Sequence, residues 1–219
     1  MGNRKAIILG STGLVGGHLR DMLLEDENYD QVIAPVRRES PLQQAKLQTP
    51  VFDFDNMDGL AKYPADDVFC CLGTTIKVAG SQEAFYKVDC TYPVEAARVM
   101  KAAGARRYYI VTALGSDEKS MVFYNRVKGE VERRVREIDF ETLEIFRPSL
   151  LQGERSEQRP GESLGNIAAG LIGWTLVGPM RKYRAIQGKV VARAMLRRAL
   201  TGEKGVRVHE SDKIQQLGQ

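Results

Sequence analysis

Residues 6–24, AIILGSTGLVGGHLRDMLL, begin as a short apolar run, pass through closely spaced glycines, and continue with helical periodicity. A buried strand that leads through a glycine turn into a helix is the arrangement that holds a dinucleotide pyrophosphate. Because Gly10 and Gly13 lack a Cβ, backbone N–H groups can approach phosphate oxygens there, and the helix dipole favours the negative charge. Gly16 lets the helix lie close to the strands. An ordinary strand-to-helix turn is the alternative, since the spacing G-x-x-G-x-x-G is one residue longer than the dinucleotide fingerprint.

A second apolar run, residues 31–36, predicts a strand that ends at Arg37 and Arg38, about 20 residues beyond Gly16. An acidic residue at this place would bind the ribose 2′-hydroxyl of NAD, whereas arginine accommodates the 2′-phosphate of NADP. The sequence therefore favours NADP(H) as the cofactor. Two solvated arginines at a strand end are the alternative.

Length and composition fit one folded unit. The chain has 219 residues, 43% hydrophobic and 27% charged, enough to bury one substantial core. We expect a single domain over residues 1–219, with a cofactor-binding core at 1–150 and a substrate-side loop and C-terminal helices at 151–219. The net charge of +4 is spread among acidic residues, so nucleic-acid binding is not needed to explain it.

Cysteine usage and hydropathy predict a reduced, cytoplasmic protein. Cys70 and Cys71 fall inside an apolar run, and with Cys90 they are expected to be core thiols. No charged-then-apolar leader opens the chain. The longest apolar stretch, residues 167–177, is too short to span a bilayer, so no membrane role is expected.

Strand-like and helical patterns alternate along the chain. Residues 93–104 predict a helix, with proline at its start and glycine just past its end. Alternation of this kind predicts an α/β fold with a Rossmann-like, doubly wound parallel sheet and helices on both faces. Further strands are predicted at residues 51–54, 68–72, 108–112 and 142–146.

Chemistry beyond cofactor binding points to Tyr124 and Lys128. Residues four apart share one face of a helix, and the apolar stripe of residues 127, 131, 135 and 138 places both near the buried side. An ammonium beside a phenol lowers the phenol's pKa, and such a tyrosine can donate or accept the proton that accompanies hydride transfer. A packed tyrosine with a surface lysine is the alternative.

Other catalytic arrangements have too few residues. Only His18 and His209 are present, so neither a histidine-based hydrolase triad nor a zinc site is expected. Asp53 and Asp55 are better explained as turn residues after a strand than as a carboxylate pair.

The C-terminal third is expected to shape the substrate side. The polar loop 152–162, with Arg155, Arg159 and Glu162, follows the predicted strand at 142–146, where ligands of open α/β sheets bind. It can recognise an anion, act as a mobile cover or be a solvated loop. Residues 164–177 predict an apolar helix and residues 190–200 an amphipathic one, which can cover the cleft or pack a second subunit in a homodimer.

Together the motifs resemble a known family. The segments are GSTGLVGGHL at 10–19, the arginine pair, CLGTT at 71–75, YNRVK at 124–128 and FRPSLLQGER at 146–155. The chain is similar to the atypical, extended-type short-chain dehydrogenase/reductase superfamily, and within it to small bacterial NAD(P)-binding proteins and the Tat-interacting-protein oxidoreductases.

This resemblance implies roles for individual residues. Tyr124 would be the acid/base and Lys128 its partner, with both beside the cofactor. The implied cofactor contacts are Gly10, Ser11, Thr12, Gly13, Leu14, Val15 and Gly16 for the pyrophosphate, Arg37 and Arg38 for the 2′-phosphate, Asp53 and Phe54 near adenine, Leu72, Gly73 and Thr74 along the ribose, and Arg147, Pro148, Ser149 and Leu150 at the nicotinamide end.

One departure from the family bears on catalysis. Members place a serine at or just after the end of the fifth strand, where its hydroxyl binds the substrate oxygen. Here Thr112 could supply that hydroxyl; a later register would place Ala113 or Leu114 there, and Ser116 is a looser alternative. Two functions follow: an NADP(H)-dependent oxidoreductase acting on a small carbonyl or hydroxyl substrate, or an NADP(H)-binding sensor that signals through a protein partner.

Overall fold

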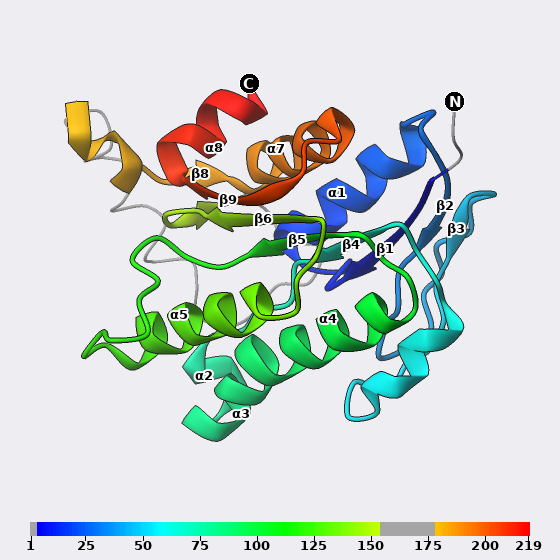
Figure 1. The fold of residues 1–219 in the computed structure, drawn as a ribbon, viewed down its shortest axis with the longest axis horizontal. Helices are drawn as coiled ribbons and strands as arrows, with labels where there is room; N and C mark the ends of the chain where they lie inside the picture. The colour runs from blue at the N-terminus through cyan, green and yellow to red at the C-terminus, as the bar shows by residue number, and fades with distance from the viewer. Residues whose placement is uncertain (1–3, 154–177) are drawn as a thin grey trace.

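One seven-stranded parallel sheet organises the protein, as the computed structural model shows for residues 4–153 and 178–219 (Figure 1). The strand order is β3-β2-β1-β4-β5-β6-β9, so successive strands are added on one side of β1 up to β3 and on its other side from β4 onward. The strands are β1 (Arg4–Leu9), β2 (Tyr29–Ile33), β3 (Leu47–Gln48), β4 (Asp67–Cys70), β5 (Arg107–Val111), β6 (Thr142–Arg147) and β9 (Gly205–Glu210), with β7 (Leu151–Gln152) and β8 (Ile186–Gln187) as a separate pair. The predicted doubly wound, Rossmann-like fold is confirmed, and ligands of such sheets bind at the switch point.

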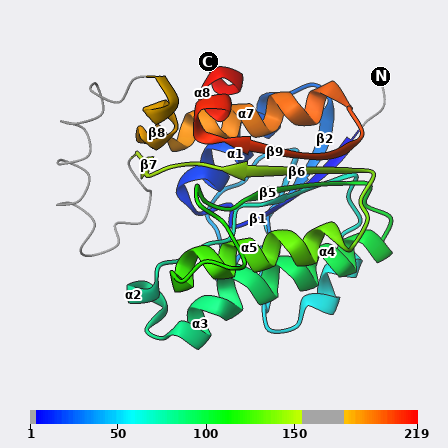
Figure 2. The same ribbon diagram turned by 60° about the vertical axis from the view of Figure 1, so that its left-hand side comes forward.

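Helices cover both faces of the sheet, as Figures 1 and 2 show from two directions. One face carries α1 (Leu14–Glu25), α7 (Gly188–Thr201) and α8 (Ser211–Gly218), and the other carries α4 (Tyr92–Ala102) and α5 (Phe123–Arg136). Shorter helices are α2 (Ile76–Ala79), α3 (Gln82–Tyr86), the 3₁₀ helices η1 (Met57–Lys62) and η4 (Gly178–Tyr183), and the π-helix η2 (Lys87–Thr91).

Alternate side chains of each strand enter two separate cores. Ile7 and Val68 pack with α4 and α5, whereas their neighbours Ile8 and Phe69 pack with α1 and α7. All four are fully buried. Neighbouring side chains of a strand point to opposite faces, so a parallel sheet covered on both sides needs continuous apolar runs.

The predicted strand boundaries at residues 31–36 and 51–54 are wrong. Strand β2 ends at Ile33, and the chain is joined to residue 51 only by an isolated bridge at Val36. Ala34 and Val36 still donate to Gln48 and Pro50, but Pro50 has no N–H to donate in return, which interrupts the ladder at this point. Residues 52–54 leave the sheet and are free to line the cavity described below.

A strand that was not predicted forms one edge of the sheet. Strand β9 pairs in parallel with β6 from Gly205 to Glu210. Between them and α7 lies a buried carboxylate, Glu144, whose oxygens are 2.7 Å from Arg198 Nη2 and 2.5 Å from His209 Nε2. Contacts to this one carboxylate therefore join β6, β9 and α7.

The C-terminal predictions have mixed outcomes. The helix predicted at 190–200 is confirmed as α7. The helix predicted at 164–177 and the loop residues Arg155, Arg159 and Glu162 lie outside the described residues. Within the described part of the chain, no helix is both long and apolar enough to cross a membrane.

Candidate functional site

The turn between β1 and α1 needs glycine at two positions. Gly10 has a φ of +86°, and a Cβ there would stand 2.6 Å from the carbonyl oxygen of Cys71 on the neighbouring strand. A Cβ on Gly16 would overlap the carbonyl oxygen of Gly10, whereas one on Gly17 would find ordinary contact at 3.6 Å. Gly13 caps α1 without a side-chain hydrogen bond. The turn thus brings uncapped helix N–H groups close to the end of β4.

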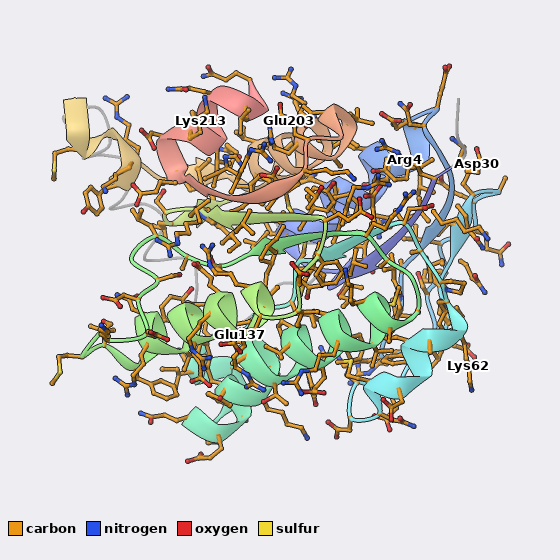
Figure 3. The ribbon with its side chains drawn as sticks, viewed as in Figure 1. Arg4, Asp30, Lys62, Glu137, Glu203 and Lys213 are labelled. Carbon is orange, nitrogen blue, oxygen red and sulfur yellow. The ribbon has the colours of Figure 1, made fainter. Side chains whose placement is uncertain are left out.

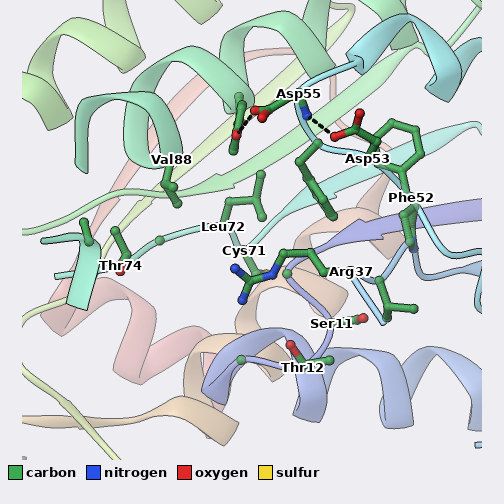
Figure 4. Close-up of a pocket in the computed structure, with 18 of the residues that line it drawn as sticks. Ser11, Thr12, Arg37, Phe52, Asp53, Asp55, Cys71, Leu72, Thr74 and Val88 are labelled. Atoms are coloured by element: carbon green, nitrogen blue, oxygen red, sulfur yellow. Dashed lines mark hydrogen bonds between the residues drawn. The ribbon is translucent and has the colours of Figure 1, made fainter. Parts of the chain in front are cut away.

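A cavity of about 700 Å³ opens beside this turn, at the carboxyl ends of β1, β2 and β4 (Figure 4). The lining includes Ser11, which is buried, and Thr12, which is exposed. Leu14 and Val15 do not line the cavity; their side chains are buried in the first turn of α1. The remaining lining residues are Gly10, Gly13, Pro35, Val36, Arg37, Val51, Phe52, Asp53, Phe54, Asp55, Cys71, Leu72, Gly73, Thr74, Val78, Ala79, Ala84, Val88 and Tyr92.

The two predicted arginines differ in position. Arg37 lines the cavity, and Figure 4 shows its guanidinium lying across it near Cys71. Arg38 is exposed and is absent from the lining. Among the described residues, neither arginine has a hydrogen bond or ion pair to another side chain. Arg37 therefore brings to the cavity a positive charge that has no ion-pair partner among the described residues.

Aromatic rings and a turn form the opposite wall. Phe54 lies between Phe52 and Tyr92, with ring centroids at 5.2 and 6.2 Å. Asp53 accepts a hydrogen bond from the backbone N–H of Asp55 at 2.9 Å, as in the turn expected from the sequence. This wall offers apolar surface to a planar ring.

The third segment of the lining is tied to a buried carboxylate. Leu72, Gly73 and Thr74 follow β4. The backbone N–H of Thr74 donates to Oδ2 of Asp89 at 2.9 Å. Asp89 is 1% exposed and belongs to the π-helix η2, a feature frequent at functional sites.

Lys128 lies on the other side of Asp89. Its Nζ is 2.7 Å from Asp89 Oδ1, and the residue is 4% exposed. Burial alone would lower the pKa of Lys128, but the Asp89 carboxylate and then Tyr124 outweigh it and raise that pKa above its ordinary value. Tyr124, one turn earlier, is half-buried with its ring 5.6 Å from that of Phe85. The structure therefore places both predicted residues on the inner side of α5.

Thr112 is held by groups that were not predicted. Its hydroxyl donates to Oε1 of Glu132 at 2.7 Å, and Glu132 is 3% exposed. Arg147 donates to the same carboxylate through Nε at 2.9 Å and Nη2 at 2.6 Å. The nearest acceptor of the Thr112 hydroxyl is thus Glu132, with the carbonyl oxygen of Phe146 farther away at 3.4 Å. The expected catalytic role of Thr112 stays a prediction, because the hydroxyl would have to leave Glu132 to donate to a substrate.

The residues after Thr112 offer no free hydroxyl. Ala113 has none, and Ser116 donates to the carbonyl oxygen of Ala113 at 2.6 Å. Its oxygen also accepts from the N–H of Ala113 at 3.3 Å, so the pair closes a local turn. Leu114 donates its N–H to Pro148, which fixes the ends of β5 and β6 together.

The segment 147–150 turns partly away from the cavity. Ser149 donates to the carbonyl oxygen of Arg184 and lies 2.9 Å from the hydroxyl of Ser211 at the start of α8. Leu150 is half-exposed. None of these residues lines the cavity, and their expected contacts at the nicotinamide end stay predictions.

The remaining chemistry is limited. Cys70, Cys71 and Cys90 are free thiols, and burial raises the pKa of each. In the described ranges, no group of three or more His, Cys, Asp or Glu side chains is arranged to hold a metal ion.

Two functional candidates were missed from the sequence. Glu132 continues the spacing of Tyr124 and Lys128 by four residues, so the helical period could have found it. Asp89 carried no such signal, because its partner is far along the chain and a π-helix sets its direction.

Comparison with known proteins agrees with this geometry. A family model described as NAD(P)H-binding matches residues 10–156. Protein HTATIP2 of Rattus norvegicus is 33% identical over 224 residues, covering 100% of this chain and 90% of that protein. The mitochondrial protein fmp52 of Aspergillus clavatus is 34% identical over 215 residues, covering 94% of this chain and 92% of that protein.

Solved structures share the fold. MoeE5 in complex with UDP-glucose and NAD has a TM-score of 0.69 at 16% identity, covering 97% of this chain and 79% of that one. UDP-glucuronic acid 4-epimerase from Bacillus cereus in complex with NAD has a TM-score of 0.68 at 15% identity, covering 94% and 77%.

Proposed function

The chain belongs to the NAD(P)H-binding family, and from this premise we propose that it is an NADP(H)-dependent oxidoreductase acting on a small carbonyl or hydroxyl compound. One observation carries the proposal: a buried, charged Lys128 lies one helical turn from Tyr124 and is joined through Asp89 to Thr74 on the wall of the cavity. Tyr124 and Lys128 themselves do not line the cavity.

The residues present fit the dinucleotide. Gly10 and Gly16 leave a cradle that a Cβ would fill, next to the uncapped start of α1. Arg37 supplies a guanidinium that pairs with no other side chain in the described ranges, which suits a 2′-phosphate, and its place on the lining supports NADP(H) over NAD(H). Phe54 and Tyr92 supply apolar surface for the adenine ring.

When bound, the cofactor supplies or receives the hydride. Tyr124 then donates a proton to the substrate oxygen through its phenol in reduction, or accepts one in oxidation. Lys128 stays an ammonium and stabilises the negative charge that forms on the phenol oxygen. Leu114 and Pro148 hold the ends of β5 and β6 in place around this region.

A second function is supported by the contacts of Thr112. With its hydroxyl donating to Glu132 and no hydroxyl on Ala113, the residue that would polarise a substrate oxygen is not free. A protein of this kind could bind NADP(H) and bias a partner surface without turnover.

Turnover separates the two. Purified protein is incubated with NADPH and a panel of aldehydes and ketones, and NADPH absorbance is followed for the wild type and Tyr124→Phe. The oxidoreductase is supported if the wild type consumes NADPH and Tyr124→Phe retains NADPH affinity but loses about 10²-fold or more in turnover. NADPH binding with no turnover on any carbonyl supports the sensor.

Two further expectations remain proposals. The homodimer is tested by light scattering on the purified chain. A cytoplasmic location is tested by cell fractionation, against relatives that are named mitochondrial.

A further inference from the structure

Lys128 is fixed by a residue that the proposed mechanism does not use. We propose that Asp89 is a positioning residue that keeps Lys128 protonated and joins its position to the loop of residues 72–75 along the cofactor cavity. This inference rests on the proposed function, in which Lys128 serves Tyr124.

Burial makes a counterion necessary. The side chains of Lys128 and Asp89 are 5% and 1% exposed, and their charged atoms are 2.7 Å apart. A buried ammonium with no partner gives up its proton at a lower pH, since desolvation disfavours the charged form. The titratable groups that face Lys128 are Asp89 from η2, Tyr124 from its own helix and Cys70 from β4. Asp89 is the carboxylate among them.

The second oxygen of the same carboxylate reaches the cavity wall. Asp89 Oδ2 accepts the N–H of Thr74, and Thr74 lines the cavity. At Gly73 a Cβ would stand 3.6 Å from Asp89 Oδ1. The Asp89 side chain therefore connects the loop after β4 to the helix that carries Tyr124. A displacement of the loop changes the position of Asp89 and, through it, the position of Lys128.

The π-helix accounts for the direction of Asp89. Helices α3, η2 and α4 follow one another without a break from Gln82 to Ala102. A π-helix inserts an extra residue per turn, which changes the face on which later side chains lie. In η2 the buried residues are Asp89 and Cys90. The π-helical segment is therefore where the carboxylate of Asp89 faces the interior of the protein.

The test follows the titration of the Lys128 ammonium by ¹⁵N NMR of lysine Nζ, with Lys128→Met to assign the signal. Asp89→Asn removes the charge while its amide oxygen can still accept from Thr74. We expect the titration midpoint of Lys128 in the wild type to lie above the ordinary lysine value of about 10.4, and Asp89→Asn to lower that midpoint by about 2 pH units or more.

Glu137→Gln is the matched control. Glu137 lies at the C-terminal end of α5, labelled in Figure 3, and pairs with Arg133 at 2.6 Å where both are about half-exposed. Removing this carboxylate should leave the Lys128 midpoint unchanged. An unchanged midpoint in Asp89→Asn as well would overturn the proposal. If Asp89→Asn does not fold, the wild type decides, since a Lys128 midpoint below about 10.4 would overturn it.

Calorimetric titration with NADPH tests the link to the loop. Asp89→Ala removes the acceptor of Thr74 as well as the charge, and we expect about tenfold weaker NADPH binding, with a smaller loss in Asp89→Asn. Unchanged affinity in Asp89→Ala would overturn the link. Failure of the proposed function can be told apart from failure of this inference. If the wild type reduces no carbonyl but Asp89→Asn still lowers the Lys128 midpoint, the oxidoreductase proposal fails and the role of Asp89 is supported.

Discussion

The hydroxyl of Thr112 donates a hydrogen bond to the carboxylate of Glu132 at 2.7 Å, and Arg147 donates to the same carboxylate. This contact joins the end of β5 to α5, and through Arg147 to the end of β6. The residue expected to bind the substrate oxygen is thus engaged in holding together the three elements that frame the site.

Thr112→Val should therefore act on stability more than on catalysis. Removing the hydroxyl leaves the buried Glu132 short of one donor, at a cost of about 1–3 kcal/mol in the free energy of unfolding. Urea unfolding measures this. Thr142→Val is the control, because Thr142 is also buried and donates to a backbone carbonyl at 3.0 Å, at the far end of its strand. A fall in turnover of about 10²-fold in Thr112→Val alone would show instead that Thr112 acts on the substrate.

Gly16→Ala should abolish NADPH binding. The added methyl group would overlap the carbonyl oxygen of Gly10, so the turn or α1 must move away from the cavity. Gly17→Ala is the matched control, since its Cβ meets its nearest neighbour at 3.6 Å and alanine suits a helix. Calorimetric titration with NADPH compares the two variants. Equal affinities of Gly16→Ala and Gly17→Ala for NADPH would contradict the placement of the glycine turn in the binding site.

Arg37→Ala should weaken NADPH by about 10–100-fold and leave NADH nearly unaffected, because a charge-assisted hydrogen bond contributes roughly 1.5–3 kcal/mol. Arg38→Ala should change NADPH affinity much less, since Arg38 does not line the cavity. Affinities of both variants for both dinucleotides check this. Equal weakening of NADPH and NADH by Arg37→Ala would contradict a 2′-phosphate role.

Stability in acid should depend on Glu144. Although burial opposes it, hydrogen bonds from His209 and Arg198 hold the pKa of Glu144 below its ordinary value. A depressed folded-state pKa stabilises the protein above the unfolded value of about 4.3, and this contribution is lost as the pH falls through the lower folded value.

Glu144→Gln tests that contribution. Breaking a buried pair costs about 3–5 kcal/mol, so the variant should be strongly destabilised at pH 7 and less so, relative to the wild type, below pH 4. Glu141→Gln, which removes an exposed carboxylate paired with Lys204, should change stability little. A Glu144→Gln deficit that stays constant with pH would contradict the assignment.

The sequence predicted those parts of the fold that depend on local pattern. Residues 6–9 are a continuous apolar strand, residues 142–146 form a strand as predicted although they include Glu144, and the glycine turn after Leu9 is where a dinucleotide motif places it. The strand end at residue 36 was wrong because Pro50 cannot donate a hydrogen bond back to this strand, and the apolar pattern does not register that loss. Strand β9 was not predicted, although Val206, Arg207, Val208 and His209 alternate as a strand does.

Site residues could be predicted where they lie close together in one segment of the sequence. Tyr124 and Lys128 share a helix face, so four-residue spacing found them. Asp89 and Glu132 act through partners on other elements, 39 and 20 residues away in sequence, and only the folded chain brings them together. The helical spacing could have indicated Glu132 itself, but no sequence pattern pairs Glu132 with Thr112 or Asp89 with Lys128.

Preference for NADP(H) over NAD(H) is the most direct consequence of the proposed site. Calorimetric titration of the purified chain with NADPH and NADH tests it in one experiment. NADPH should bind at least about tenfold more tightly than NADH, in keeping with Arg37 on the cavity wall. A clear preference for NADH would contradict the NADP(H) assignment, and no binding of either would contradict the whole site.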